Sequence, residues 1–155
     1  MKLSLKAINK SNWLQCVEIE PSISQRHFIG SPVSVYIAQS RFEKWMKPTA
    51  IYNGDEIVGF IQYGLNPELQ SYWIIGLVID EKHQKNGYGK KALIELLHKI
   101  EQKHDYRPIY AGHKPDNYVM ENILKSIGFS KLDYIIEGHV VHRIWLDKIA
   151  SDYKI

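Results

Sequence analysis

The spacing of apolar residues predicts a strand and then two helices in the first third of the chain. Residues 3–8, LSLKAI, alternate apolar and polar side chains, which is the period of a β-strand. Residues 10–20 carry apolar side chains at helical spacing, and we expect Ser11 to be the N-cap of this helix. Residues 31–46 begin with Ser31 followed by a proline, a typical helix start, so Ser31 is the expected N-cap there.

The middle of the chain has the pattern of three strands. Two apolar runs within residues 49–64 flank Asn53 and Gly54, whose tolerance of positive φ predicts a hairpin turn. Residues 71–80, SYWIIGLVID, form a nearly continuous apolar run, as in a strand that is buried on both faces. Gly76 interrupts this run, which indicates a bulge or a close approach of a ligand to the backbone.

The remaining patterns predict two more helices and three more strands. Residues 89–104 carry a helical apolar stripe, and residues 117–129 carry another that ends at a glycine. Residues 107–113 form a short strand, and residues 129–146 form two strands that turn at a Glu-Gly pair. The predicted order is β-α-α-β-β-β-α-β-α-β-β, which indicates a mixed α/β or α+β fold in a single domain over residues 1–155.

Composition and charge exclude several classes of protein. With 155 residues, of which 45% are hydrophobic and 24% charged, the chain is long and apolar enough to bury a core. A net charge of +3 is too small to indicate a nucleic-acid partner, and no apolar run is long enough to cross a membrane. The amino terminus lacks the features of a signal peptide, and the single cysteine, Cys16, has no disulfide partner within the chain. We therefore expect a cytoplasmic protein.

A glycine-rich and cationic stretch lies between the strand predicted at 71–80 and the helix that follows it. Its sequence over residues 83–92, HQKNGYGKKA, includes Lys85, Lys90 and Lys91. The start of a helix presents backbone N–H groups and a positive dipole end, which together form an anion site that phosphate usually occupies. The alternative is an ordinary solvated helix start, since runs of charge often lie on exposed helix faces.

One phosphate-binding motif, the dinucleotide fingerprint, fits this stretch poorly. Gly87 and Gly89, with an alanine three positions later, match its loose form. The fingerprint needs a tight turn directly after the strand and an acidic residue about twenty positions further on. Here residues 80–86 separate the strand from Gly87, and no carboxylate lies around Ile109. We therefore reject a dinucleotide site.

The stretch Gln84–Gly89 resembles instead the Q/R-x-x-G-x-G/A loop of the GNAT family of N-acetyltransferases. Asn117, followed at a fixed spacing by Gly128 and Phe129, resembles that family's second motif. The predicted order of elements is similar to the family's fold over nearly the whole chain. The resemblance implies a mostly antiparallel central sheet of about seven strands flanked by four helices. Within the family, the chain is most similar to bacterial spermine/spermidine (diamine) acetyltransferases.

The resemblance implies acetyl-coenzyme A as co-substrate and no metal. The pantetheine arm would pair with the strand after Gly76 in the way an added β-strand does, and the loop would hold the pyrophosphate. Asn117 would form a hydrogen bond to the cofactor. The alternative for Asn117 is an ordinary helix N-cap. The implied cofactor-binding residues are Leu77, Val78, Ile79, Gln84, Lys85, Asn86, Gly87, Tyr88, Gly89, Lys90 and Asn117.

The implied chemistry is attack of a neutral amine on a thioester. Deprotonating an alkylammonium near neutral pH costs roughly 4 kcal/mol, which a base would lower. The tyrosine with which this family often protonates the thiolate falls on Leu124, and leucine cannot donate a proton. As catalytic residues we nominate Tyr118 and Glu20, with Tyr110 and His113 as further candidates. The alternative for each is an ordinary structural position, either buried with a hydrogen-bonded polar group or exposed to solvent.

Substrate-binding and metal-binding residues are harder to predict. Tyr63 and Trp73, and also Tyr72, offer aromatic faces to a cationic amine, although half-buried strand aromatics are the ordinary explanation. The sequence does not show whether the acidic residues that a polycation would prefer come together; these are Glu18, Glu20, Asp55, Glu56 and Glu68. The seven histidines show no convincing metal-binding spacing, so we expect isolated surface histidines and no metal site.

Two classes of function remain open at this stage. The leading hypothesis is an N-acetyltransferase that acetylates a small-molecule amine, specifically a polyamine or diamine. The alternative is a coenzyme A-binding sensor or regulatory module without catalysis, which Leu124 favours. A third version keeps the enzyme but changes the acceptor to an antibiotic or a protein amino terminus. Family analogy also raises a homodimer as a candidate state.

Overall fold

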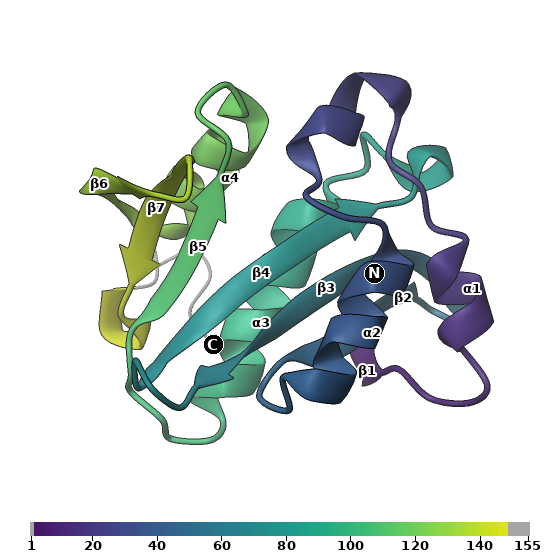
Figure 1. The fold of residues 1–155 in the computed structure, drawn as a ribbon, viewed down its shortest axis with the longest axis horizontal. Coiled ribbons are helices and arrows are strands. Elements are labelled where there is room, and N and C mark those ends of the chain that lie inside the picture. Colours follow the sequence, from purple (N-terminus) through teal and green to yellow (C-terminus); the bar gives the residue numbers. More distant parts are fainter. Residues whose placement is uncertain (1, 149–155) are drawn as a thin grey trace.

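The computed structural model describes residues 2–148, which form one seven-stranded sheet with helices on both faces (Figure 1). The strands are β1 (Leu3–Ala7), β2 (Lys47–Asn53), β3 (Glu56–Asn66), β4 (Ser71–Ile79), β5 (Ile109–His113), β6 (Ser130–Ile136) and β7 (His139–Ile144). The α-helices are α1 (Trp13–Val17), α2 (Val33–Phe42), α3 (Tyr88–Glu101) and α4 (Tyr118–Ile127), and short 3₁₀ helices are η1 (Ile23–Phe28), η2 (Glu81–His83) and η3 (Leu146–Lys148).

The order of strands across the sheet is β1-β2-β3-β4-β5-β7-β6, and every neighbouring pair is antiparallel except β4 and β5. This arrangement confirms the predicted fold class and order of elements. The single domain predicted over residues 1–155 extends past the described residues at both ends, so its full extent stays a prediction. Within residues 2–148, no helix is long and apolar enough to span a membrane.

The parallel pairing between β4 and β5 is short. It joins only three residue pairs, from Tyr72 opposite Ile109 to Ile74 opposite Ala111. Beyond this point the two strands diverge, and Figure 1 shows the gap widening toward the carboxyl end of β4. In this part of β4 only the side facing β3 is paired with another strand among the described residues.

A bulge in β4 accompanies this divergence. Gln62 on β3 pairs with Gly76, and the next residue of β3, Tyr63, pairs with Ile74, so Ile75 is an extra residue in β4. The prediction of a distortion at Gly76 is therefore confirmed. A side chain at Gly76 would meet the ring of Tyr36 from α2 at 2.8 Å, so the glycine lets α2 pack directly on the bulge.

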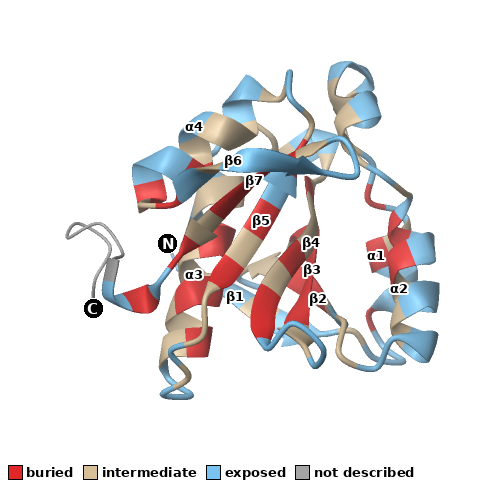
Figure 2. Cartoon of the chain, turned by 60° about the vertical axis from the view of Figure 1, so that its left-hand side comes forward, coloured by how far each residue is buried: buried red, intermediate tan, exposed pale blue. Residues whose placement is uncertain are grey.

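Two apolar cores lie on opposite faces of the sheet. α3 and α4 cover one face, and the predicted stripe of α3 is fully buried there; its members are Ala92, Leu93, Leu96, Leu97 and Ile100. α1 and α2 cover the other face, where Cys16, Tyr36 and Phe60 belong to the second core. Figure 2 shows buried positions running through the central strands, whereas β6, at the edge of the sheet, is mostly exposed.

The hairpins agree with the sequence prediction, with one shift of position. Asn53 pairs with Glu56, so the two central turn residues of the first hairpin are Gly54 and Asp55, one position later than expected. Gly54 carries a φ of +63°, as turns of this length require. In the last hairpin the predicted Glu-Gly pair forms the turn, with both residues at positive φ.

The helix starts on the α1–α2 side were predicted wrongly. The N-cap of α1 is Asn12 rather than Ser11, and the N-cap of α2 is Pro32 rather than Ser31. Asn12 is buried and accepts a hydrogen bond from the backbone of Asn9, so local side-chain bonds set where α1 begins. Both helices are shorter than expected, and η1 between them was not predicted.

The tight contact at Gly64 in β3 yields a stability prediction. A Cβ at Gly64 would lie 1.8 Å from the carbonyl oxygen of Trp45, so Gly64→Ala forces the backbone apart. We expect it to lower the free energy of unfolding by about 1–3 kcal/mol, the range for overpacking. Urea denaturation followed by circular dichroism measures this. Gly112→Ala in β5 is the matched control, because its Cβ would meet nothing closer than 3.4 Å. Equal stability of the two variants would contradict the prediction.

Candidate functional site

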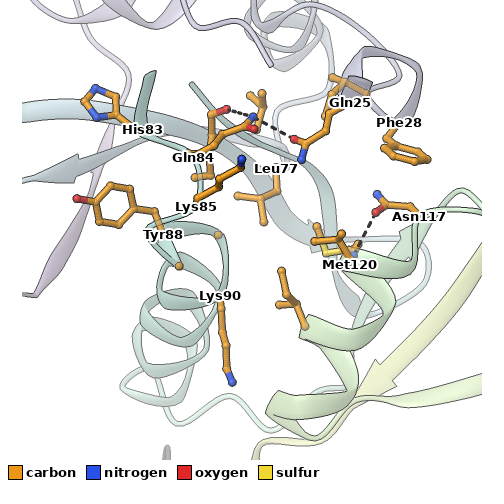
Figure 3. A pocket seen from close by; sticks show the side chains of 17 residues that line it. Gln25, Phe28, Leu77, His83, Gln84, Lys85, Tyr88, Lys90, Asn117 and Met120 are labelled. Atoms are coloured by element: carbon orange, nitrogen blue, oxygen red, sulfur yellow. Dashed lines mark hydrogen bonds between the residues drawn. The ribbon is translucent and has the colours of Figure 1, made fainter. Parts of the chain in front are cut away.

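A cavity of about 410 Å³ lies beside β4, between the glycine loop at the start of α3, the first turns of α4 and η1. Figure 3 shows these elements surrounding it. Leu77, Val78 and Ile79 of β4 form one wall. The lining includes Lys85, Lys90 and His83 but no aspartate or glutamate. The cavity therefore suits an anionic or neutral ligand better than a cation.

The glycine loop gives this cavity the geometry of an anion site. Lys85 and Gly87 have φ values of +66° and +73°, so the backbone turns sharply before the helix begins. Gly87 is the N-cap of α3, and its carbonyl accepts the N–H of Lys91 at 3.1 Å. The first N–H groups of a helix have no partner within the helix and lie at its positive dipole end. The start of a fourteen-residue helix thus faces the cavity.

Polar side chains hold the loop in this shape. Gln84 donates from Nε2 to the carbonyl of Ile79 at 3.1 Å and to Oε1 of Gln25 at 3.0 Å. Asn86 donates from Nδ2 to the carbonyl of His83 at 3.0 Å and to that of Gln84 at 3.2 Å. The loop is therefore tied both to β4 and to η1. Figure 3 shows the bond from Gln84 to Gln25 crossing one end of the cavity.

Most of the residues predicted to bind the cofactor do line this cavity. Those that line it are Leu77, Val78, Ile79, Gln84, Lys85, Gly87, Tyr88, Gly89, Lys90 and Asn117. Asn86 is the exception, because its side chain folds back onto the loop. Asn117 is also the N-cap of α4, where its Oδ1 accepts the N–H of Met120 at 3.1 Å. The N-cap role considered for Asn117 is thus present together with a place at the cavity.

A second cavity, of about 300 Å³, continues along β4 to the bulge. It shares five lining residues with the first: Phe28, Ile29, Leu77, Asn117 and Met120. At its other end lie Gly76 on β4, His113 on β5, and Tyr36 and Gln39 on α2. Leu124 also lines it, so the leucine noted in the sequence does stand at the cavity wall. The lining of this second cavity contains no carboxylate either.

Together the two cavities follow the unpaired side of β4. Backbone N–H and C=O groups in the middle of a sheet normally pair with a neighbouring strand. Because β5 diverges after Ala111, the backbone of residues 77–79 has no strand partner on that side among the described residues. An extended ligand can form an added strand there, with its anionic end at the start of α3.

Of the nominated catalytic and substrate-binding residues, only His113 lines either cavity. Tyr118 is 66% exposed at the start of α4, and Glu20 forms an exposed ion pair with Arg26. Tyr63 is buried, and Trp73 stacks on Tyr110 with ring centroids 4.8 Å apart. The roles proposed for Tyr118, Glu20, Tyr63 and Trp73 therefore stay predictions.

Sequence reasoning missed the contribution of the segment from η1 to α2. Phe28, Tyr36 and Gln39 line the cavities, yet no motif marks them. Burial raises the pKa of the Tyr36 phenol, and backbone N–H groups of Ser31 and Gly30 oppose that shift. The phenol at the cavity wall is therefore protonated at neutral pH. The one sequence signal was Gly76, which indicated a close neighbour without naming it.

Two groups of ionisable residues lie elsewhere. Glu18, Asp55 and Glu56 do come together, with Asp80, but in a separate groove beyond η2. The expectation of isolated surface histidines is wrong for His113 and His142, which are buried with their Nε2 atoms 2.9 Å apart. Burial of His142 and the proximity of His113 lower the pKa of His142 to about 4. Burial also raises the pKa of the Cys16 thiol to about 11, which agrees with its place in the core.

Comparison with known proteins identifies the family. The sequence pattern that defines the Acetyltransferase (GNAT) family matches residues 6–129. The chain belongs to this family. It is therefore an acyltransferase of the GNAT type, with the glycine loop and α3 inside the matched region.

Individual relatives of this GNAT chain include polyamine acetyltransferases. Spermine/spermidine N(1)-acetyltransferase of Bacillus subtilis is 27% identical over 135 residues, which cover 83% of this chain and 88% of the relative. The solved structure of spermidine N-acetyltransferase from Vibrio cholerae in complex with CoA and spermine superposes with a TM-score of 0.74 at 13% identity, covering 95% and 97% of the two chains. PaiA N-acetyltransferase from Thermoplasma acidophilum in complex with coenzyme A superposes with a TM-score of 0.70 at 12% identity, covering 94% and 99%.

Proposed function

We propose that this GNAT chain transfers an acetyl group from acetyl-coenzyme A to a primary amine of a small molecule, with a diamine or polyamine as the acceptor. The observation that carries the proposal is the continuous lining along the unpaired side of β4, which runs from the start of α3 to the bulge at Gly76. One end of this path suits a phosphate group, its middle suits an extended amide chain, and its far end has space for a second substrate.

In this proposal the residues of the first cavity hold the cofactor. The backbone of the glycine loop and the start of α3 bind the pyrophosphate, with Lys85 adding positive charge. Residues 77–79 pair with the two amides of the pantetheine arm. Asn117 keeps its bond to Met120, and its amide Nδ2 is the group that donates to the arm. Coenzyme A in the solved complexes of two relatives with the same fold supports this assignment.

The thioester then lies beside the bulge, in the second cavity. The amine attacks the thioester carbon, a backbone N–H near Val78 stabilises the oxyanion, and the C–S bond breaks to release the thiolate of coenzyme A. We assign protonation of that thiolate to Tyr36, which lines the cavity beside Gly76 and keeps its proton at neutral pH. Tyr36 would thus supply the proton that Leu124 cannot supply. Water or the predicted Glu20 would take the proton from the amine.

The acceptor assignment rests on the relatives, whereas the charge of the cavity bears only on the attacking nitrogen. The curated relative is named for spermine and spermidine. An attacking amine must be uncharged, and a wall without carboxylates does not stabilise the ammonium form. The remaining parts of the proposal are a cytoplasmic site of action, which the unpaired Cys16 fits, and a homodimer, which rests on family analogy alone.

One observation favours a second candidate function. Leu124 is fully buried at the wall of the second cavity, where a hydroxyl would be expected in an enzyme of this family. A coenzyme A-binding sensor without catalysis would keep the first cavity and need no proton donor. An acetyltransferase that acts on an antibiotic or a protein amino terminus differs only in the acceptor. Turnover experiments separate these three possibilities.

The proposed reaction predicts release of free coenzyme A from acetyl-coenzyme A in the presence of an amine. A thiol-reactive dye measures this with spermidine, spermine, short diamines, an aminoglycoside and a peptide with a free amino terminus. We expect the highest kcat/KM with a diamine or polyamine. Binding of coenzyme A without turnover of any amine would instead establish the sensor, and turnover of the aminoglycoside or peptide alone would reassign the acceptor.

The cofactor site predicts a difference between two substitutions at Gly89. A Cβ there would meet only side-chain carbons of Ile79 and Leu77, at 3.8 and 3.9 Å, so Gly89→Ala fits and serves as the control. Gly89→Leu places a branched side chain in the cavity, and we expect it to weaken coenzyme A binding by at least about tenfold. Isothermal titration calorimetry measures the affinity. Leucine favours helices, so thermal unfolding should show a folded variant. Equal affinity of both variants would place the cofactor elsewhere.

The role given to Tyr36 predicts a selective loss of turnover. Tyr36→Phe removes the hydroxyl and keeps the ring that packs on the bulge, so we expect kcat to fall by about 10–100-fold while the affinity for coenzyme A is unchanged. Steady-state kinetics and calorimetry measure the two quantities. Tyr106→Phe, at an exposed position away from both cavities, is the matched control. Tyr118→Phe is measured in the same series. If kcat falls in Tyr118→Phe but not in Tyr36→Phe, the proton donor is Tyr118 rather than Tyr36.

A further inference from the structure

Three side chains of metal-binding types, two histidines and one glutamate, come together between α4 and the β5–β7 pair. His113 ends β5, His142 lies within β7, and Glu121 lies on α4. One potential ligand atom of each residue lies within 4.8 Å of those of the other two. His113 and His142 are 4% and 0% exposed, and the Glu121 side chain is 13% exposed. Side chains from three separate elements thus point into one shielded space.

The hydrogen bonds of His113 prepare its Nε2 atom to be a ligand. Its Nδ1 lies 2.7 Å from the carbonyl oxygen of Lys114, so this nitrogen carries the proton and donates it. The Nε2 atom that faces His142 therefore has its lone pair available. Histidines that bind metals are oriented in this way, with the second ring nitrogen donating to a backbone carbonyl or carboxylate. His142 offers its Nε2 on the same side, while its buried Nδ1 has no hydrogen-bond partner among the described residues.

We propose that His113, Glu121 and His142 form a binding site for a divalent transition-metal ion of the zinc class. Two imidazole nitrogens and one carboxylate oxygen are a donor set that such ions prefer, whereas Mg²⁺ and Ca²⁺ prefer oxygen ligands alone. The proposal goes beyond the acetyl transfer described above and does not depend on it. With three protein ligands, a fourth position is open to water.

The distance between the two histidines fits a small rearrangement on binding. The two Nε2 atoms lie 2.9 Å apart, which also suits a direct hydrogen bond in which His142 donates to His113. Two Zn–N bonds of about 2.0–2.1 Å at a tetrahedral angle place the nitrogens about 3.3 Å apart. A metal ion would therefore separate the rings by a few tenths of an ångström and displace the shared proton. The direct hydrogen bond is the competing explanation that the experiment must exclude.

The charges around Glu121 are compatible with this site. Lys125 and Lys131 both pair with its Oε1 atom, at 3.4 and 3.3 Å. A carboxylate has a second oxygen, so Glu121 can hold the lysines and a metal ion together. The bound ion would join α4 to β5 and β7 and thereby fix the helix that begins at Asn117. The ion would therefore have a structural role, holding these elements together. The site lies beside the second cavity, which His113 also lines.

Equilibrium dialysis against Zn²⁺, followed by elemental analysis, tests the proposal. The chain is prepared without a histidine tag, stripped with a chelator, and dialysed with Mg²⁺ in excess. We expect one zinc ion per chain, and with Co²⁺ a ligand-field absorption band of a low-coordinate site. Glu121→Gln and His142→Asn should each weaken binding by about tenfold or more, since even outer-shell changes cost that much.

Two controls make the result specific. His104→Asn removes an exposed histidine outside the cluster and should leave the stoichiometry and affinity unchanged. Lys131→Gln removes an ion pair of Glu121 but no metal ligand, so this variant should still bind zinc. Its comparison with Glu121→Gln shows whether weaker binding comes from the lost ligand or from the lost ion pair. If His142→Asn does not fold, the zinc affinities of Glu121→Gln and Lys131→Gln are compared instead, and weaker binding by Glu121→Gln alone supports the site. Absence of zinc on the wild-type chain, or equal binding by Glu121→Gln and wild type, would overturn the proposal and leave a hydrogen-bonded histidine pair.

Discussion

The functional site depends on one constraint, which is that β4 cannot stay paired with β5 beyond Ile74. The extra residue at the bulge turns the strand, and Tyr36 occupies the space that a side chain at Gly76 would need. Peptide groups inside a sheet are costly to leave without partners. The opening therefore creates a demand for hydrogen bonds along residues 77–79, which water or an extended ligand must satisfy. Both cavities lie along this opening.

The glycine loop shows how the rest of the chain supports that opening. Lys85 has a φ of +66°, a conformation that costs a non-glycine residue roughly 1–2 kcal/mol. Side-chain bonds from Gln84 and Asn86 to backbone carbonyls hold the loop in this strained form. The polar residues of the motif thus maintain the shape of the cradle, whereas backbone groups and Lys85 are left to face a ligand. A binding site made of backbone atoms needs this kind of internal scaffold.

The sequence predicted those features that local physics determines. The two hairpins, the stripe of α3 and the distortion at Gly76 follow from turn chemistry, helical period and the missing side chain of glycine. The N-caps at Ser11 and Ser31 were wrong because a neighbouring residue, Asn12 or Pro32, takes the position. Contacts between distant residues were beyond this reasoning. Tyr36 meets Gly76 only through the packing of α2, and His113 meets His142 only because β5 pairs with β7.

The single parallel junction in the sheet also determines when the site can form during folding. Strands β1 to β4 include two hairpin-joined antiparallel pairs, which close short loops. Parallel strands need a long crossover, and here residues 80–108, with the whole glycine loop and α3, connect β4 to β5. Closing that crossover costs more chain entropy than closing a hairpin. We therefore expect the first cavity to be completed late, because the part of its lining that α4 supplies, including Asn117 and Met120, follows β5 in the chain.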